Sequence, residues 1–188
     1  MLLGKIFLAS AGETVSEFQT KAALLPKLAA FVDWPEAAFA TTNAPIKLGL
    51  LGEFPPDEDF TNALRHRTAH GRSFLVAQLT NVSNAMDCHI LFISPKEALQ
   101  VTNILNAVAG KPILTVGDQT KFTEAGGMIN FSKRDSKVCF EINALAANHS
   151  GLKISSKLLQ VARDINAPPV RNAFEPPPAT RRAHVPNN

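Results

Sequence analysis

The sequence contains no tyrosine, a single tryptophan and only two cysteines among its 188 residues. No apolar run approaches the eighteen or more residues that a membrane-spanning helix needs. The glycine patterns of dinucleotide-binding and P-loop sites, G-x-G-x-x-G and G-x-x-x-x-G-K-[ST], are also missing. These absences argue against a spanning helix and against the common nucleotide-binding motifs.

The charged residues do not indicate a nucleic-acid site. The chain carries 19 Lys and Arg against 16 Asp and Glu, a formal net charge of +3. A nucleic-acid binder usually gathers its basic side chains on one face or helix, often interleaved with aromatic residues. Here the basic residues are scattered along the sequence, so we expect a solvated, mildly basic surface and no nucleic-acid partner.

No set of residues predicts catalysis, a metal or a cofactor. His66 and His70 are four apart, a spacing that could chelate a metal if both lay on one helix, but zinc sites need three or four protein ligands and no further ligands lie nearby in sequence. Cys88 and His89 are neighbours on an expected strand, so their side chains point to opposite faces and cannot act as a nucleophile and its base. Asp118 follows a strand and is expected to cap a short helix. We therefore expect a protein that is not an enzyme.

The two cysteines leave two interpretations open. Cys88 and Cys139 lie in separate apolar segments, and they could pair in an oxidising compartment only if their Cα atoms come within about 7 Å. The preferred interpretation is two buried thiols that pack as small hydrophobic side chains.

The apolar pattern predicts one α/β domain. With 45% hydrophobic residues, the chain can bury one compact core. Strands are expected at 46–52, 73–79, 88–93, 111–116, 127–131 and 137–142. Helices are expected at 15–34, 57–67, 95–109 and 155–165. The predicted fold is a single three-layer α/β domain, a mixed and mostly parallel sheet flanked by helices, with an antiparallel hairpin in its C-terminal half.

Local signals support parts of this prediction. Ser94-Pro95-Lys96-Glu97 combines an N-cap serine, a proline at the first helical position and a glutamate at the third. The helix that follows should turn Ala98, Val101, Leu105 and Val108 inward and end at Gly110. With the strands before and after it, this helix forms a right-handed βαβ unit. Gly126-Gly127 is expected to form a turn with positive φ.

Both ends of the chain differ from the domain at 15–166. Residues 1–14 contain a short apolar stretch followed by Ala9 and Ala11, which fit the A-x-A pattern of signal peptidase sites. We interpret this segment as the remnant of a signal peptide, with an ordinary frayed terminus as the alternative. Residues 167–188 hold six of the 13 prolines and little apolar periodicity, which predicts a disordered tail.

Several segments together resemble the YfiR family. They include K-A-A at 21–23 with F-V-D-W-P at 31–35, C-H-I-L-F-I-S at 88–94, and I-L-T-V-G-D at 113–118. They also include G-G-M-I-N-F at 126–131, F-E-I-N at 140–143 and I-S-S-K-L-L at 154–159. No single motif is specific, but they occur in the family's order over roughly 20–165.

The resemblance implies an exported periplasmic protein with a regulatory role. Members of the family restrain a membrane-bound diguanylate cyclase, an enzyme of cyclic di-GMP signalling, by binding its periplasmic domain. It also implies an outer-membrane lipoprotein partner that relieves the restraint, and a homodimer.

The expected partner surface is the exposed side of the first helix and the segment that follows it. Trp34, Phe39 and Phe54 are the candidate partner contacts, because aromatic anchors dominate interface energetics. The competing interpretation places all three in the core.

A periplasmic small-molecule-binding protein is the alternative function. A receiver-like domain is the nearest fold-level alternative, but the third strand ends at Ser94, where an acceptor aspartate would be expected.

Overall fold

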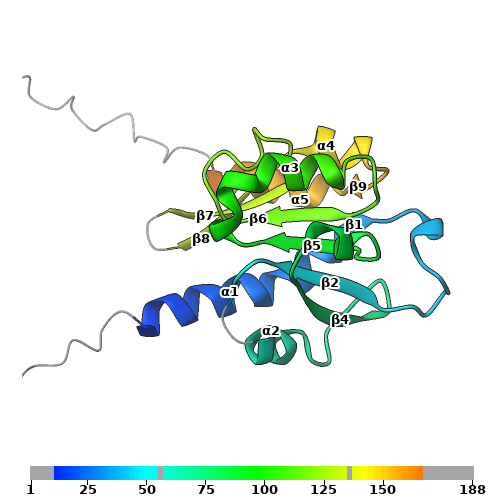
Figure 1. The fold of residues 1–188 in the computed structure, drawn as a ribbon, viewed down its shortest axis with the longest axis horizontal. Helices are drawn as coiled ribbons and strands as arrows, with labels where there is room; N and C mark the ends of the chain where they lie inside the picture. The colour runs from blue at the N-terminus through cyan, green and yellow to red at the C-terminus, as the bar shows by residue number, and fades with distance from the viewer. Residues whose placement is uncertain (1–10, 55–56, 135–136, 167–188) are drawn as a thin grey trace, which may run out of the picture.

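The computed structural model describes residues 11–54, 57–134 and 137–166 (Figure 1). The signal-like segment before residue 11 and the proline-rich segment 167–188 therefore lie outside the described residues.

A seven-stranded mixed sheet forms the centre of the domain, in the order β3-β4-β2-β5-β6-β7-β8. Its strands are β2 (Ile46–Leu51), β3 (Thr68–Ala69), β4 (Arg72–Leu79), β5 (Ile90–Ile93), β6 (Leu114–Gly117), β7 (Ile129–Arg134) and β8 (Lys137–Ile142). The five central strands, β4, β2, β5, β6 and β7 in sheet order, are parallel to one another. Strands β3 and β8 pair antiparallel at the two edges. The predicted mixed sheet with a C-terminal-half hairpin is confirmed.

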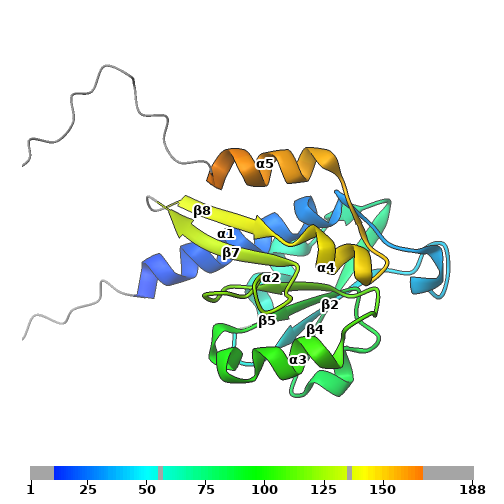
Figure 2. The same ribbon diagram turned by 90° about the horizontal axis from the view of Figure 1, so that it is seen from above.

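Helices cover both faces of this sheet and complete three layers (Figures 1 and 2). On one face, α1 (Ala11–Ala29), α2 (Asp57–Leu64) and α5 (Ser156–Asn166) contribute to the larger apolar core. On the other face, α3 (Val101–Ala107) and the 3₁₀ helix η2 (Val82–Ala85) pack over the second core. Strand β5 lies between the two cores and is buried along its whole length, as its apolar sequence predicts.

The first helix ends five residues earlier than predicted. Helix α1 stops at Ala29, and β1 (Val32–Asp33) pairs antiparallel with β9 (Lys153–Ile154) in a separate two-stranded sheet. His70 accounts for part of this ending, because its Nε2 donates to the carbonyl oxygens of Ala29 at 3.2 Å and Val32 at 2.9 Å. The Ala29 carbonyl at the helix end is thereby bonded to a distant side chain.

The predicted helix after Ser94 is present but differs in its first turns. Ser94 is the N-cap, and its Oγ accepts a hydrogen bond from the Lys96 backbone N–H at 3.3 Å. The segment then begins as a 3₁₀ helix, η3 (Pro95–Gln100), before α3. A 3₁₀ helix has three residues per turn, so the apolar phase shifts and Ala98 is exposed, contrary to the prediction. Leu105 and Val108 are buried as expected.

The turn at Gly126-Gly127 follows the prediction and also allows close packing. Gly126 has a φ of 101°, the left-handed region that favours glycine. A Cβ at Gly127 would lie 2.2 Å from the ring of Phe122, and one at Gly117 would lie 2.5 Å from it. The fully buried Phe122 is therefore seated against two glycine backbones.

Candidate functional site

The parallel strands create a topological switch point between β2 and β5. Taken in chain order, the five parallel strands run 2-1-3-4-5 across the sheet, and the order reverses between β2 and β5. Ligand sites of doubly wound sheets lie at such a point, outside the carboxyl ends of the strands. A cavity of about 240 Å³ lies here, and we call it the switch-point cavity. Its lining residues are Glu17, Phe18, Lys21, Glu53, Phe54, Phe92, Pro95 and Asp118.

Three phenylalanine rings form the apolar part of the switch-point cavity. The ring centroids of Phe18 and Phe54 are 5.9 Å apart, and those of Phe54 and Phe92 are 5.1 Å apart. Phe18 and Phe92 also contact the fully buried Phe60, at 4.5 and 5.9 Å between centroids. Phe54, a candidate partner contact from the sequence, thus lies in the cavity wall and packs against the core.

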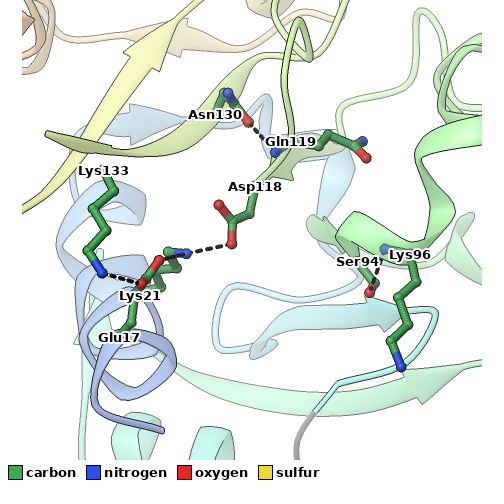
Figure 3. A network of polar contacts seen from close by, with 8 residues as sticks. All are labelled: Glu17, Lys21, Ser94, Lys96, Asp118, Gln119, Asn130 and Lys133. Carbon is green, nitrogen blue, oxygen red and sulfur yellow. Dashed lines mark hydrogen bonds and ion pairs between the residues drawn. The ribbon is translucent and has the colours of Figure 1, made fainter. Parts of the chain in front are cut away.

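A buried lysine links α1 to the end of β6 (Figure 3). Lys21 is only 4% exposed, and its Nζ lies 2.6 Å from Glu17 Oε1 and 2.5 Å from Asp118 Oδ2. Lys133, on β7, reaches the other oxygen of Glu17 at 3.1 Å. The expected capping role of Asp118 is therefore wrong: its carboxylate pairs with Lys21, and the residues after it form turns without a helix.

The two carboxylates of this network differ in their electrostatics. The hydrogen bond from Lys21 lowers the pKa of Glu17, helped by Lys133 and opposed by partial burial. Burial raises the pKa of Asp118, and the bond from Lys21 only partly offsets that effect. Asp118 therefore carries a charge that its surroundings compensate incompletely.

The rim of the switch-point cavity is polar and more exposed. Glu53 pairs with Lys96 at 2.5 Å, and both side chains are exposed. The hydroxyl of Ser94 donates to the Glu53 backbone carbonyl at 2.8 Å. Ser94 thus holds the loop after β2 against the end of β5, at the position where a receiver-like domain would carry its acceptor aspartate.

The other end of the sheet carries a second cluster, formed by Trp34, Phe39, Arg72 and His89, which we call the amino-edge cluster. His89 is buried; its Nδ1 accepts from the Lys47 N–H at 3.0 Å, and its Nε2 donates to the Ala38 carbonyl at 3.0 Å. Burial lowers the pKa of His89 despite the bond to Ala38, which favours the neutral ring. These bonds give His89 a structural role, since its ring joins the start of β2 to the segment at Ala38.

Trp34 and Phe39 are both held within the amino-edge cluster. The Trp34 indole N–H donates to the His89 carbonyl at 3.2 Å. The Phe39 ring stacks on the His89 ring, with centroids 4.3 Å apart and an interplanar angle of 14°. The Arg72 guanidinium lies 3.7 Å from the same Phe39 centroid. Both faces of Phe39 are therefore covered, and only its edge is available to another molecule.

The structure separates the three candidate contacts and adds one that the sequence reasoning missed. Trp34 and Phe39 lie at the amino end of β2 and β5, whereas Phe54 lies beyond their carboxyl ends, about 20 Å away along a six-residue strand. Phe31, between α1 and β1, is 39% exposed. It was overlooked because it belonged to the predicted helix 15–34.

The histidine pair does not form a metal site. Helix α2 ends at Leu64, so His66 and His70 are not on a helix and lack the geometry expected of an i, i+4 pair. His70 is bonded to the end of α1. Across the described part of the chain, no group of three or more His, Cys, Asp or Glu side chains is placed to hold a metal ion.

Cys88 and Cys139 are free, buried thiols. Cys88 precedes β5 and Cys139 lies on β8, and these strands are three positions apart in the sheet. Three strand spacings amount to about 14 Å, about twice the Cα separation that a disulfide spans. Burial raises the pKa of Cys88, which keeps this thiol protonated.

None of the described helices is long and apolar enough to cross a membrane.

Comparison with known proteins gives one match at the level of families. No curated protein sequence matches the chain. A family model described as YfiR/HmsC-like matches residues 18–163, which include all seven strands of the sheet, the amino-edge cluster and, apart from Glu17, the lining of the switch-point cavity. The chain therefore belongs to the YfiR/HmsC-like family.

Proposed function

We propose that this protein is a non-enzymatic periplasmic regulator, which binds the periplasmic domain of a membrane-bound diguanylate cyclase and restrains it. Family membership is the observation that carries the proposal, because the YfiR/HmsC-like family regulates diguanylate cyclase signalling and is periplasmic. Restraint requires only that the protein binds one state of the cyclase more tightly than the other. An outer-membrane lipoprotein that relieves the restraint, and a homodimeric state, belong to the same proposal.

The proposed contact surface is the end of α1 together with the amino-edge cluster. Ala23, Lys27, Ala30 and Phe31 are exposed along and just after the second half of the helix. Phe31 is the aromatic anchor of this surface, since a ring that is already exposed can be buried on binding without any rearrangement of the core. Trp34 and the edge of Phe39 frame it. Phe54 is left out because it lies at the other end of the sheet.

The regulatory role is tested by measuring cyclic di-GMP in cells. Deletion of the gene should raise the intracellular cyclic di-GMP concentration. A plasmid copy with an intact export signal should restore the original concentration. A copy retained in the cytoplasm should not restore it. An unchanged concentration in the deletion strain contradicts the proposal, and so does full restoration by the cytoplasmic copy.

Direct binding is tested with purified domains. The protein should bind the purified periplasmic domain of a membrane diguanylate cyclase encoded in the same genome, as measured by titration calorimetry. Phe31→Ser should weaken that binding at least tenfold, equivalent to about 1.4 kcal/mol. Leu145→Ser is the control, because Leu145 is an apolar side chain that is 72% exposed on α4 (Ala144–His149), and the variant also replaces an exposed apolar group with serine. Equal effects of the two variants would remove Phe31 from the proposed surface.

A further inference from the structure

The switch-point cavity combines an aromatic wall with an excess of carboxylates. Its described lining contains the rings of Phe18, Phe54 and Phe92 and the carboxylates of Glu17, Glu53 and Asp118, with Lys21 as the only cation among these residues. The lining alone therefore has two more negative than positive charges. Lys96 and Lys133 pair with Glu53 and Glu17 from outside the lining, so three lysines stand against the three carboxylates, and among the described residues Asp118 is the carboxylate that is paired with Lys21 alone.

An anionic ligand does not fit this arrangement. Among the described residues, Lys21 is the only cation in the lining, and its Nζ already lies 2.6 Å from Glu17 and 2.5 Å from Asp118. An incoming carboxylate or phosphate would have to displace one of these partners and would face the remaining carboxylates at close range. Like charges brought together in a partly desolvated site are strongly unfavourable.

A cation fits the same groups. Asp118 contacts Lys21 through Oδ2, and within the described residues no donor is placed on its Oδ1. Because burial raises the pKa of Asp118, a second positive charge beside this carboxylate would favour its ionised form. The faces of phenylalanine rings also attract ammonium groups, and more strongly when water is excluded.

We propose that the switch-point cavity binds a small organic ammonium ion with an apolar body. The apolar body packs against Phe18, Phe54 and Phe92, and the ammonium group contacts Asp118 and the rim at Glu53. The cavity of about 240 Å³ lies just below the range of roughly 300–1,000 Å³ typical of drug-sized ligands. The ligand is therefore a small amine. This inference stands apart from the proposed docking surface, which lies at the opposite end of the sheet.

Three probes that share one ring and differ in charge provide the test. Phenethylamine, 2-phenylethanol and phenylacetate are titrated into the purified protein at pH 7 by calorimetry, with thermal unfolding as a second readout. Phenethylamine should bind and raise the Tm, since a ligand of the native state stabilises it. The neutral and anionic probes should bind at least tenfold more weakly. Absence of phenethylamine binding, or equal binding of either other probe, overturns the proposal.

Variants and chemical shifts locate the site. Asp118→Asn and Phe54→Ala should each weaken phenethylamine binding at least tenfold. Glu53→Gln is the additional variant that should fold even if Asp118→Asn does not, because Glu53 is exposed, and it should weaken binding in the same direction. Glu36→Gln, an exposed carboxylate at the amino edge, is the control that should leave binding unchanged.

In ¹H–¹⁵N spectra, phenethylamine should shift the amide signals of Gly52, Ser94 and Asp118 and leave that of His89 in place. Binding that survives both Glu53→Gln and Phe54→Ala, or that shifts only signals remote from the cavity, would overturn the assignment.

Discussion

Lys21 Nζ lies 2.5 Å from Asp118 Oδ2, although 97 positions separate the two residues in the chain. The pair joins the first helix to the carboxyl end of β6, beside the switch-point cavity. Lys21 is almost fully buried, whereas the two carboxylates that bind it are partly exposed. The Lys21 ammonium therefore holds two acidic groups together at the carboxyl end of the parallel strands, and its removal should affect both carboxylates.

Lys21→Met should destabilise the protein by about 1–3 kcal/mol. Breaking a fully buried ion pair by removing one partner costs about 3–5 kcal/mol, and the partial exposure of Glu17 and Asp118 reduces that figure. Urea unfolding followed by circular dichroism measures the change. Lys96→Met is the control: its pair with Glu53 is exposed, so the free energy of unfolding should change by less than about 0.5 kcal/mol.

The double variant Lys21→Met/Asp118→Asn should recover part of the stability lost in Lys21→Met. Neutralising Asp118 removes the carboxylate that the first substitution leaves without its cation. A strictly additive double variant would show that the two side chains do not interact energetically.

Gly127→Ala should destabilise the protein by about 1–3 kcal/mol through overpacking. The added Cβ would lie 2.2 Å from the ring of Phe122, which is fully buried and cannot move outward freely. Phe122→Leu removes part of that ring, so the two substitutions together should cost less than the sum of their separate costs. Thermal unfolding of the four proteins gives the coupling energy, and a value near zero would contradict the packing argument.

His89 should make stability depend on pH in a window that opens near the ordinary histidine pKa of about 6.5 and extends below it. Burial lowers its pKa in the folded protein, so below the unfolded value of about 6.5 the unfolded chain binds a proton that the folded chain does not. The free energy of unfolding should therefore fall as pH falls through this window. The cations Lys47 and Arg72 act in the same direction on the ring.

His89→Gln should flatten this pH dependence, although it also lowers stability at every pH by disturbing the hydrogen bonds of the ring. Chemical unfolding at several pH values provides the measurement. At lower pH, Glu17 and Asp118 act in opposite directions on stability, because the pKa of Glu17 is lowered and that of Asp118 is raised in the folded protein. An unaltered slope in His89→Gln would assign the dependence to other groups.

The two thiols should remain unreactive in the native protein. Cys88 and Cys139 are buried and free, and burial raises the pKa of Cys88, which depletes the reactive thiolate. Iodoacetamide at pH 7 should label neither residue until urea unfolds the chain, and then both, as mass spectrometry would record. A native species two mass units lighter, which returns to full mass on reduction, would instead indicate a disulfide.

The elements that the sequence predicts well have strong local signals. Strand β5 is an apolar run buried on both faces, and Ser94 has the proline and the hydrogen-bond acceptor of a helix start. Helix α4 was missed because its six residues, ALAANH, are too short to show helical periodicity. The two-residue strands β1 and β9 are defined only by each other, across more than a hundred positions of chain.

The functional site was harder to predict because it depends on contacts between distant segments. Nothing in the sequence around Lys21 indicates that its ammonium is buried, since its partner Asp118 is on another element. Phe54 and Phe39 look alike in sequence, because each is an aromatic residue close to a proline that ends a predicted element. Only the sheet topology shows that one lines a cavity and the other lies at the opposite edge between His89 and Arg72.

The β1–β9 pair fixes where the two ends of the domain are presented. From this pair, α1 runs back to its start at Ala11 and α5 runs forward to its end at Asn166, and both points lie at the same end of the molecule, on the left in Figures 1 and 2. An affinity tag or surface linker attached directly before Ala11 or directly after Asn166 would therefore leave from that side. Immobilised in this way, the protein would display η1 (Glu36–Ala38) and the nearby Phe31 toward the bulk solution.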